Sequence, residues 1–398
     1  MKKEKLENSI NQFILWYKKN GENSFDRMDY WSSPLGILAK KTFYKNKIVG
    51  APLAIIGLLL ENFFPTIQKL FSKPHSEVIG DSHLALSFLN LYEDSNDIEN
   101  LQEAERLIQK ICSYSTKGFS GMCWGYTFGW QQSRDKFWPK STPMITITPY
   151  AFWALKKHYE LTNSEISKKR LLSIANFTLL DLNVTNLEDD IQSLSYSPIS
   201  YDIVINANTY SAAVLYQAYE LTNEIKYKNK ADIAIKFILS FQGEMGEWYY
   251  EAKSKQDNFI DNFHTCFVLR NLFYCYQVTN DTTILNAIIK GYNYYRLNLF
   301  YSNGRPKHFA VSKYIKLRKY EMYDYAEGIK LGVLLDSEIP GAKQKAIDLA
   351  DDLISNFQQG GGYFVTRVTS FNTYHRVPYM RWPQSQLFYA LTLLNQKI

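Results

Sequence analysis

Cysteine and histidine are scarce in this sequence of 398 residues, which has four of the first and six of the second. The cysteines form no Cys-x-x-Cys pair, and no histidine stands at metal-ligand spacing beside them; they are Cys112, Cys123, Cys266 and Cys275. This pattern argues against a zinc site and against a disulfide framework. We therefore expect a protein of a reducing compartment that binds no metal and needs no cofactor.

Long apolar runs and runs of one charge are also missing. The longest apolar run, residues 48–60, is too short to span the ~30 Å core of a bilayer, which favours a buried helix and no stable membrane insertion. The residues after Met1 lack the apolar core of a signal peptide, which predicts a cytoplasmic protein. A net charge of +6 without clustered Lys and Arg argues against nucleic acid as a partner and allows a mild preference for anionic ligands.

Aromatic residues, in contrast, are abundant. The sequence contains 30 Tyr, 24 Phe and 8 Trp, and 46% of its residues are hydrophobic. A chain of this composition buries a large core and has aromatic side chains left over for a pocket.

A helical segment with a tyrosine near its end recurs along the chain. In residues 206–223 the apolar positions follow the spacing i, i+3, i+4, i+7, which is typical of an α-helix. The closing tyrosines are separated by 67, 60 and 57 residues, and continuing at about 59 residues reaches two leucines in apolar helical patterns. The repeat positions are Tyr92, Tyr159, Tyr219, Tyr276, Leu335 and Leu394.

Six such units predict an all-α protein, an (α/α)6 toroid or six-hairpin barrel, with short β-hairpin turns at one mouth. We expect one domain over residues 1–398. Residues 1–75 form a helical N-terminal preface, which supplies a partner for the last helix, 382–394, and so helps to close the ring. In this fold the turns after the outer helices meet at one mouth, where a site is expected.

An aromatic loop at residues 118–134 is one candidate for the substrate-binding part of that site. Aromatic rings stack on the apolar faces of sugars, and amide and cationic groups hydrogen-bond hydroxyls or carboxylates. The alternative is an aromatic plug that closes the barrel. The candidate residues are Trp124, Tyr126, Trp130, Gln131, Arg134 and, just beyond the loop, Lys140.

A histidine stands at the start of another predicted inner helix. Asp261 and Asn262 precede His264, which places the imidazole in the first helical turn. The helix N-terminus favours a neutral imidazole, which suits a general base or a hydrogen-bond donor. We list His264 as a catalytic candidate and Asn262 as a binding candidate. A structural role for His264 remains the alternative, and Asp261 is more readily explained as a helix cap.

The segment 374–384 has a density of polar and aromatic groups that core packing does not require. Arg381 is the strongest candidate and would pair with a substrate carboxylate; Tyr379 would act as an acid or base if nearby arginines lowered its pKa. His375 is a second candidate base. Trp382 and Gln384 are assigned to substrate binding.

Three carboxylates lie at or near predicted inner-helix starts, and a glycosidase requires two facing a sugar. They are Asp202, Asp324 and Glu327, of which the last two share a helical face; capping or solvent exposure is the alternative for each. Asn206 and Asn208 begin another inner helix and are expected to face the mouth.

Several stretches resemble the bacterial VpsJ-like polysaccharide biosynthesis proteins, within the six-hairpin glycosidase-like group. The matching text is IGDSHLALSFLNLYE, CWGYTFGWQQSR followed by STP, FIDNFHTCFVLRNL, NGRPKHF and YMRWPQSQLFYAL. The resemblance implies a toroid that acts in the cytoplasm in surface polysaccharide biosynthesis, and it implies no particular reaction. Phe128 and Gly129 depart from the more polar link expected between Tyr126 and Trp130.

Two classes of function follow. The first is a carbohydrate-active enzyme that binds a uronic-acid-like sugar unit, free or activated, and acts on it. In an epimerase or lyase, Arg381 would neutralise the carboxylate while Tyr379 or His264 moved the proton; a hydrolase would use Asp202 with Asp324 or Glu327. The second class is a non-catalytic glycan-binding or scaffold protein.

Overall fold

The structure is a computed structural model that describes residues 1–252, 258–312 and 317–398. Its helices are α1 (Lys3–Asn20), α2 (Asp29–Ser32), α3 (Pro34–Lys45), α4 (Lys47–Phe63), η1 (Pro65–Leu70), α5 (Val78–Ser95), α6 (Ile98–Ser113), α7 (Thr148–Thr162), α8 (Glu165–Leu180), α9 (Ile205–Thr222), α10 (Ile225–Ser240), α11 (Asn262–Thr279), α12 (Thr282–Asn298), α13 (Met322–Leu334), α14 (Ala342–Phe357), η2 (Met380–Gln384) and α15 (Ser385–Asn395). The strands are β1 (Trp130–Gln131), β2 (Phe137–Trp138), β3 (Val184–Asn186), β4 (Gln192–Leu194), β5 (Ile260–Asp261), β6 (Phe309–Val311), β7 (Arg318–Glu321), β8 (Arg367–Thr369) and β9 (Tyr374–His375).

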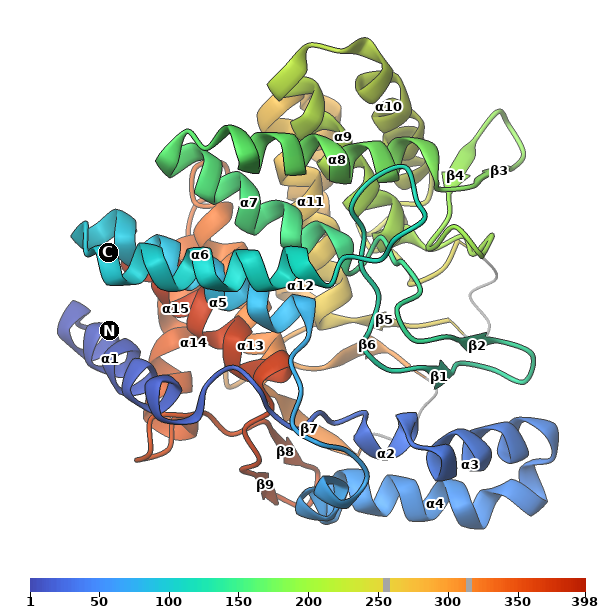
Figure 1. Cartoon of the computed structure of the whole chain (residues 1–398), viewed down its shortest axis with the longest axis vertical. Helices are drawn as coiled ribbons and strands as arrows, with labels where there is room; N and C mark the ends of the chain where they lie inside the picture. The colour runs from blue at the N-terminus through green and yellow to red at the C-terminus, as the bar shows by residue number, and fades with distance from the viewer. Residues whose placement is uncertain (253–257, 313–316) are drawn as a thin grey trace.

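The helices form the predicted (α/α)6 toroid (Figure 1). The odd-numbered helices from α5 to α15 form an inner ring, in which each packs against the next, and α15 packs against α5 to close the circle. The even-numbered helices from α6 to α14 lie outside, each against the inner helix that precedes it. The predicted all-α fold class is therefore confirmed.

The N-terminal helix takes the outer position beside α15. α1 packs on α15 and α14, and Lys3 Nζ donates a hydrogen bond of 2.8 Å to the carbonyl oxygen of Ile398. Both ends of the chain lie on the same side of the molecule (Figure 1). The N-terminal helix thus packs beside the last helix of the chain.

The recurring tyrosines mark the last turn of four inner helices. At each of these ends an asparagine adopts the left-handed conformation and its N–H donates to the carbonyl of the tyrosine four residues earlier. Asparagine tolerates this conformation better than most residues, so the chain turns sharply into the outer helix. These residues are Asn96, Asn163, Asn223 and Asn280.

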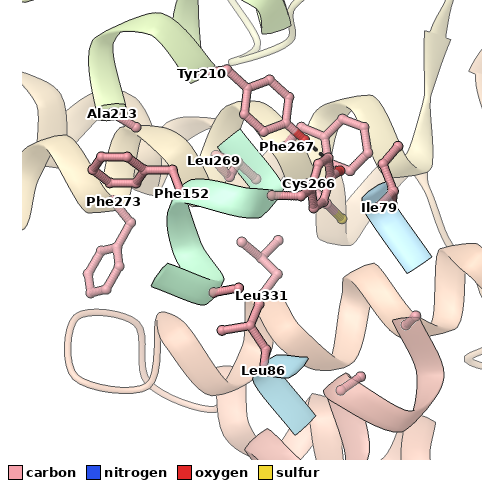
Figure 2. Close-up of a cluster of buried hydrophobic side chains, with 14 of the residues drawn as sticks. Ile79, Leu86, Phe152, Tyr210, Ala213, Cys266, Phe267, Leu269, Phe273 and Leu331 are labelled. Atoms are coloured by element: carbon pink, nitrogen blue, oxygen red, sulfur yellow. Dashed lines mark hydrogen bonds between the residues drawn. The ribbon is translucent and has the colours of Figure 1, made fainter. Parts of the chain in front are cut away.

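Inner and outer helices are buried differently. α6 is amphipathic, with Ala104, Leu107, Ile108 and Ile111 facing the core, whereas α9 is buried all round from Ile205 to Ala218. Figure 2 shows apolar side chains of this core, including Leu86, Phe152, Ala213, Leu269 and Leu331, which come from α5, α7, α9, α11 and α13. The core therefore sits between the two rings of helices and within the inner one.

A buried polar network crosses the axis of the inner ring. Glu327 of α13 accepts hydrogen bonds from Lys330, at 2.5 Å, and from Arg270 of α11. Arg270 Nη2 also donates to the Tyr210 hydroxyl at 3.2 Å, and Lys330 Nζ lies 3.5 Å from His83 Nε2. Burial lowers the pKa of His83 well below its usual value, so the ring is neutral and accepts from Lys330.

The strands are short and lie mainly in the connections after the outer helices. Pairs β1–β2, β3–β4 and β5–β6 are antiparallel, and β7, β8 and β9 form one three-stranded sheet. Phe364 makes a single bridge to Gln358, and β8 pairs with β7 and β9.

The apolar run at residues 48–60 is helical, but the expectation that it is buried is wrong. It lies in α4, where Ile48 is 86% exposed and Ile55 52% exposed. α4 forms an antiparallel pair with α3 at the edge of the molecule (Figure 1), and side chains on its other face are exposed. In the described parts of the chain, no helix is both long and apolar enough to cross a membrane.

The buried network around Glu327 predicts that removing one of its cations destabilises the protein more than removing a half-exposed cation does. Arg270→Met should lower the free energy of unfolding by ~3–5 kcal/mol, because it removes one of the two cations paired with the buried Glu327 carboxylate. Lys228→Met is the matched control. It breaks a half-exposed pair with Asp232, worth less than ~1 kcal/mol. Urea unfolding of both variants checks this, and equal losses would contradict a structural role for the network.

Candidate functional site

A pocket of about 330 Å³ opens where several loops meet at the N-terminal ends of inner helices. Its walls are aromatic, and its polar groups are two histidines, one aspartate and three arginines. Five predicted site residues line it, namely Tyr126, Trp130, His264, Arg381 and Trp382. The structure thus brings together parts of the three segments that the sequence analysis singled out.

A wider groove of about 870 Å³ lies outside the ring, between α1 and helices α5 and α6. Its principal charged groups are already paired with one another, because Arg106 contacts both Glu22 and Glu103. We therefore place the candidate site at the mouth and not in this groove.

Local pairing of two short strands positions the centre of the mouth. β5 pairs with β6, and the N–H of Asn262 donates to the carbonyl of His308 at 2.9 Å. Asp261 is the N-cap of α11 and accepts from the N–H of His264 at 3.0 Å, as its expected role as a cap predicted. His264 and His308 are thereby held in neighbouring segments, and both line the pocket.

The first carboxylate–histidine pair is Asp261 with His264. Nδ1 of His264 lies 2.9 Å and 2.8 Å from the two oxygens of the Asp261 carboxylate. A carboxylate partner at Nδ1 favours the tautomer in which Nδ1 carries the proton and Nε2 has a free lone pair. The ring packs among Tyr250, Phe259 and Phe263, so Nε2 is a base in an aromatic surrounding.

The second pair is Asp324 with His308. Nδ1 of His308 lies 2.8 Å from Asp324 Oδ2, and both side chains are buried. Burial raises the pKa of Asp324 to about 6, although the contact with His308 acts in the opposite direction. Asp324 therefore orients His308 in the same way that Asp261 orients His264.

Positive charge accumulates on the side of the pocket next to His308. Arg27, Arg318 and Arg367 share two buried carboxylates, Glu61 and Glu321. Three guanidinium groups thus face two carboxylates. Burial and the neighbouring Arg27 and Arg367 lower the pKa of Arg318 to about 9, so a bound anion would stabilise its charged form.

Arg381 lines the pocket but is already paired. Its Nε and Nη2 each lie 2.6 Å from an oxygen of Asp26, and its guanidinium stacks over Tyr126 at 5.2 Å. A bidentate pair of this kind neutralises its charge. Arg318, whose side chain is 29% exposed, is the better placed cation for a substrate carboxylate.

Tyr379 and His375 lie outside the described lining of the pocket. The condition set for Tyr379 as an acid or base, a lowered pKa, is not met, because burial raises its pKa. Burial also lowers the pKa of His375 to about 4, and its Nε2 contacts the carbonyl of Asn62. Both residues tie the last segment to α4 and η1, since Tyr379 also accepts a bond from Gln68.

The predicted pair of hydrolytic carboxylates does not assemble across the pocket. Asp202 forms an ion pair with Lys136, and Glu327 is buried in the axial network between Arg270 and Lys330. Asp324 reaches the mouth only through His308. Asp261 is the one carboxylate among the described lining residues, and it is engaged by His264.

The remaining binding candidates have other surroundings. Trp124 donates from its indole to the carbonyl of Ile111, and the amides of Asn208, Asn262, Gln131 and Gln384 bond to the backbone. Asn206 is buried beside a very small cavity near Trp248. Arg134 and Lys140 are exposed and, like the others in this group, lie outside the described lining.

Sequence reasoning missed three polar residues of the lining, His308, Arg318 and Arg27. His308 belongs to the NGRPKHF stretch, but its partner Asp324 is 16 residues away on another element. Arg27 lies in the segment treated as packing only. Across residues 1–252, 258–312 and 317–398, no three His, Cys, Asp or Glu side chains are grouped to hold a metal ion.

No protein-family model and no curated protein matches the chain. Solved structures with the same fold include three carbohydrate-processing enzymes. An unsaturated glucuronyl hydrolase specific for heparin has a TM-score of 0.60 and 11% identity over 80% of this chain and 87% of its own. A sugar epimerase from a ruminal bacterium has a TM-score of 0.59 and 13% identity, over 81% of this chain and 88% of its own. The α-1,6-mannanase GH76A from a Salegentibacter species has a TM-score of 0.57 and 12% identity, over 81% of this chain and 89% of its own.

These similarities support the (α/α)6 toroid fold. Identities of 11–13% do not transfer a reaction or a substrate. The resemblance to VpsJ-like proteins has no support among the comparisons and stays a prediction. The function has to be argued from the pocket itself.

The raised pKa of Asp324 predicts how stability changes with pH. The unfolded carboxyl has a pKa of ~3.9, so the fold favours the protonated form, and this contribution is complete below about pH 4 and lost as pH rises through about 6. Relative to Asp324→Asn, which does not titrate, the wild type should lose about 2 kcal/mol between pH 4 and pH 7. Urea unfolding across this range measures the difference. A flat or rising difference would contradict the burial argument.

Proposed function

We propose that this protein is a carbohydrate-active enzyme that binds an anionic, uronic-acid-like sugar at the mouth of the toroid and moves a proton on it. The observation that carries the proposal is the presence of two carboxylate-oriented imidazoles, His264 and His308, in one aromatic pocket. Aromatic walls suit the faces of a sugar ring, and an oriented imidazole suits proton transfer near neutral pH.

Binding of the anion rests on Arg318. Its Nη1 lies 3.4 Å from His308 Nε2, so a carboxylate held by Arg318 would also be within reach of His308. The N-termini of the inner helices point to the same end of the toroid and add positive potential. Neutralising the carboxylate makes the proton on the adjacent carbon more acidic. A histidine can then remove that proton.

The reaction that fits best is epimerisation. One imidazole, neutral at Nε2, takes the proton from the carbon next to the carboxylate, and the other, protonated, returns a proton to the opposite face. Both rings neighbour the ring of Phe263, at 4.2 Å for His264 and 5.8 Å for His308, which places them around one small volume. A lyase would need one of the two bases and would instead expel the group on the next carbon.

Two-carboxylate hydrolysis has less support, because each candidate carboxylate is paired with a cation or a histidine. On the resemblance noted above, we place the reaction in the cytoplasm and in bacterial surface polysaccharide biosynthesis, with a glycan or an activated sugar as substrate. A non-catalytic glycan-binding or scaffold protein is the alternative, and the experiment below separates the two.

The proposed proton transfer is tested by exchange in deuterated water. Uronic-acid glycosides and nucleotide-linked uronic acids are incubated with the protein, and deuterium at the carbon next to the carboxylate is measured by mass spectrometry and NMR. His264→Asn and His308→Asn should each reduce exchange by at least ~100-fold, because each removes one proton carrier. The control is His158→Asn. His158 lies near the C-terminal end of α7, away from the mouth, and contacts Ser167.

Other outcomes separate the alternatives. An unsaturated product would indicate a lyase, and cleavage without deuterium uptake would indicate a hydrolase. Saturable sugar binding by the wild type with no exchange and no product would indicate a binding protein. Unchanged exchange in either histidine variant would overturn the two-histidine assignment.

The role of Arg318 is tested by ligand charge. Arg318→Ala should weaken binding of glucuronate by roughly tenfold and leave binding of glucose unchanged, because a charge-assisted hydrogen bond is lost only with the anion. Arg305→Ala, which breaks an ion pair with Asp352 outside the described pocket lining, is the matched control. Titration calorimetry measures the affinities, and equal weakening for both sugars would contradict the assignment.

A further inference from the structure

The outward face of α4 is apolar. Ile48, Pro52, Ile55 and Leu59 follow the spacing i, i+4, i+7, i+11, so they share one face of the helix, and all four are exposed. A helix of a globular protein turns such a stripe to the core, as α6 does here. We call Ile48, Pro52, Ile55 and Leu59 the α4 apolar face.

The apolar surface continues beyond α4. Phe64 and Leu70 follow the helix and are 54% and 83% exposed. Phe371, in the turn between β8 and β9, is 69% exposed, and its ring lies 5.8 Å from that of Phe63. Exposed apolar side chains are common singly, but a continuous set on one element indicates a binding surface.

The exposed charges of the segment that contains this surface, residues 30–76, have one sign. Five exposed lysines flank it, namely Lys41, Lys45, Lys47, Lys69 and Lys73. Glu61 is the one acidic residue between positions 30 and 76, and it is buried, with Arg27 at 2.9 Å. The exposed charged side chains of this segment are therefore all positive.

We infer that α4 and its flanking lysines form a docking surface for an anionic lipid membrane. Apolar side chains between lysines match the boundary between acyl chains and negatively charged headgroups. With 17 residues, α4 is about 25 Å long, so it lies along the interface and does not cross it. The docking is peripheral and reversible.

A second copy of this chain fits the surface less well. In a two-fold dimer through the α4 apolar face, the exposed lysines of this segment would find no exposed carboxylate in the same segment of the other copy. Anionic headgroups supply the missing negative charge. In Figure 1, α4 lies at the edge of the molecule, with α3 between it and β1, and the residues of the α4 apolar face are exposed.

The inference does not depend on the proposed reaction. Arg27 and Met28, which line the pocket, are continuous in sequence with α2 and the α3–α4 pair. Membrane docking would therefore hold the pocket at a constant position relative to the lipid surface, whatever chemistry the pocket performs.

Vesicle sedimentation with the whole protein tests the inference. The probes are vesicles of phosphatidylcholine alone and vesicles that also contain phosphatidylglycerol. The wild type should bind the second kind preferentially, and added salt should weaken binding. Ile48→Ser with Ile55→Ser should reduce the apparent affinity by roughly tenfold or more, and Lys45→Glu with Lys47→Glu should abolish the preference for phosphatidylglycerol.

The matched control is Ile166→Ser with Ile225→Ser, which changes exposed isoleucines of α8 and α10, at 63% and 58% exposure, and should leave vesicle binding unchanged. Far-UV circular dichroism and urea unfolding check that the variants are folded. Equal binding to both kinds of vesicle, or full binding by the Ile48/Ile55 variant, would overturn the inference. A dimer in sedimentation equilibrium that this variant dissociates would overturn it in favour of a second copy.

Discussion

Closing six helices into a ring leaves a space along the axis, and filling that space is the constraint on which the rest of this structure depends. Here the space is crossed by Arg270, Glu327 and Lys330, with His83 and Tyr210 at the ends of the network. Removing charged groups from water is costly unless they are paired, so the network requires the inner helices to keep one register relative to one another. Burial lowers the pKa of Lys330 to about 8, because the contact with Glu327 offsets only part of the loss of solvation.

The same register builds the mouth. Along α11, Phe263 lines the pocket, Phe267 lies one turn deeper, and the guanidinium of Arg270 is 5.2 Å from the Phe267 ring. The pocket thus rests on an aromatic layer above the charged network. His264 and His308 stand at its wall, each oriented by a carboxylate from an inner-helix terminus or first turn. A rigid ring below the mouth is what allows these short contacts between distant segments.

The candidate site was predictable only in part. The stretches around Tyr126, His264 and Trp382 carry unusual local composition, and the fold brings these three side chains to one pocket. Local composition does not reveal which charges are already neutralised. Arg381 is paired with Asp26, a residue 355 positions away, and His308 gains its role from Asp324 and its strand pairing with the start of α11.

The sequence by itself determined the helices, their pairing into six hairpins and the closure of the ring, because apolar periodicity and the Asn-terminated joints are local properties repeated along the chain. The tertiary structure decided which polar groups are free. Burial and ion pairing depend on side chains brought together from distant positions, as the pair formed by Arg381 and Asp26 illustrates. It also decided that α4, apolar enough for a core, faces outward, because the ring was already complete without it.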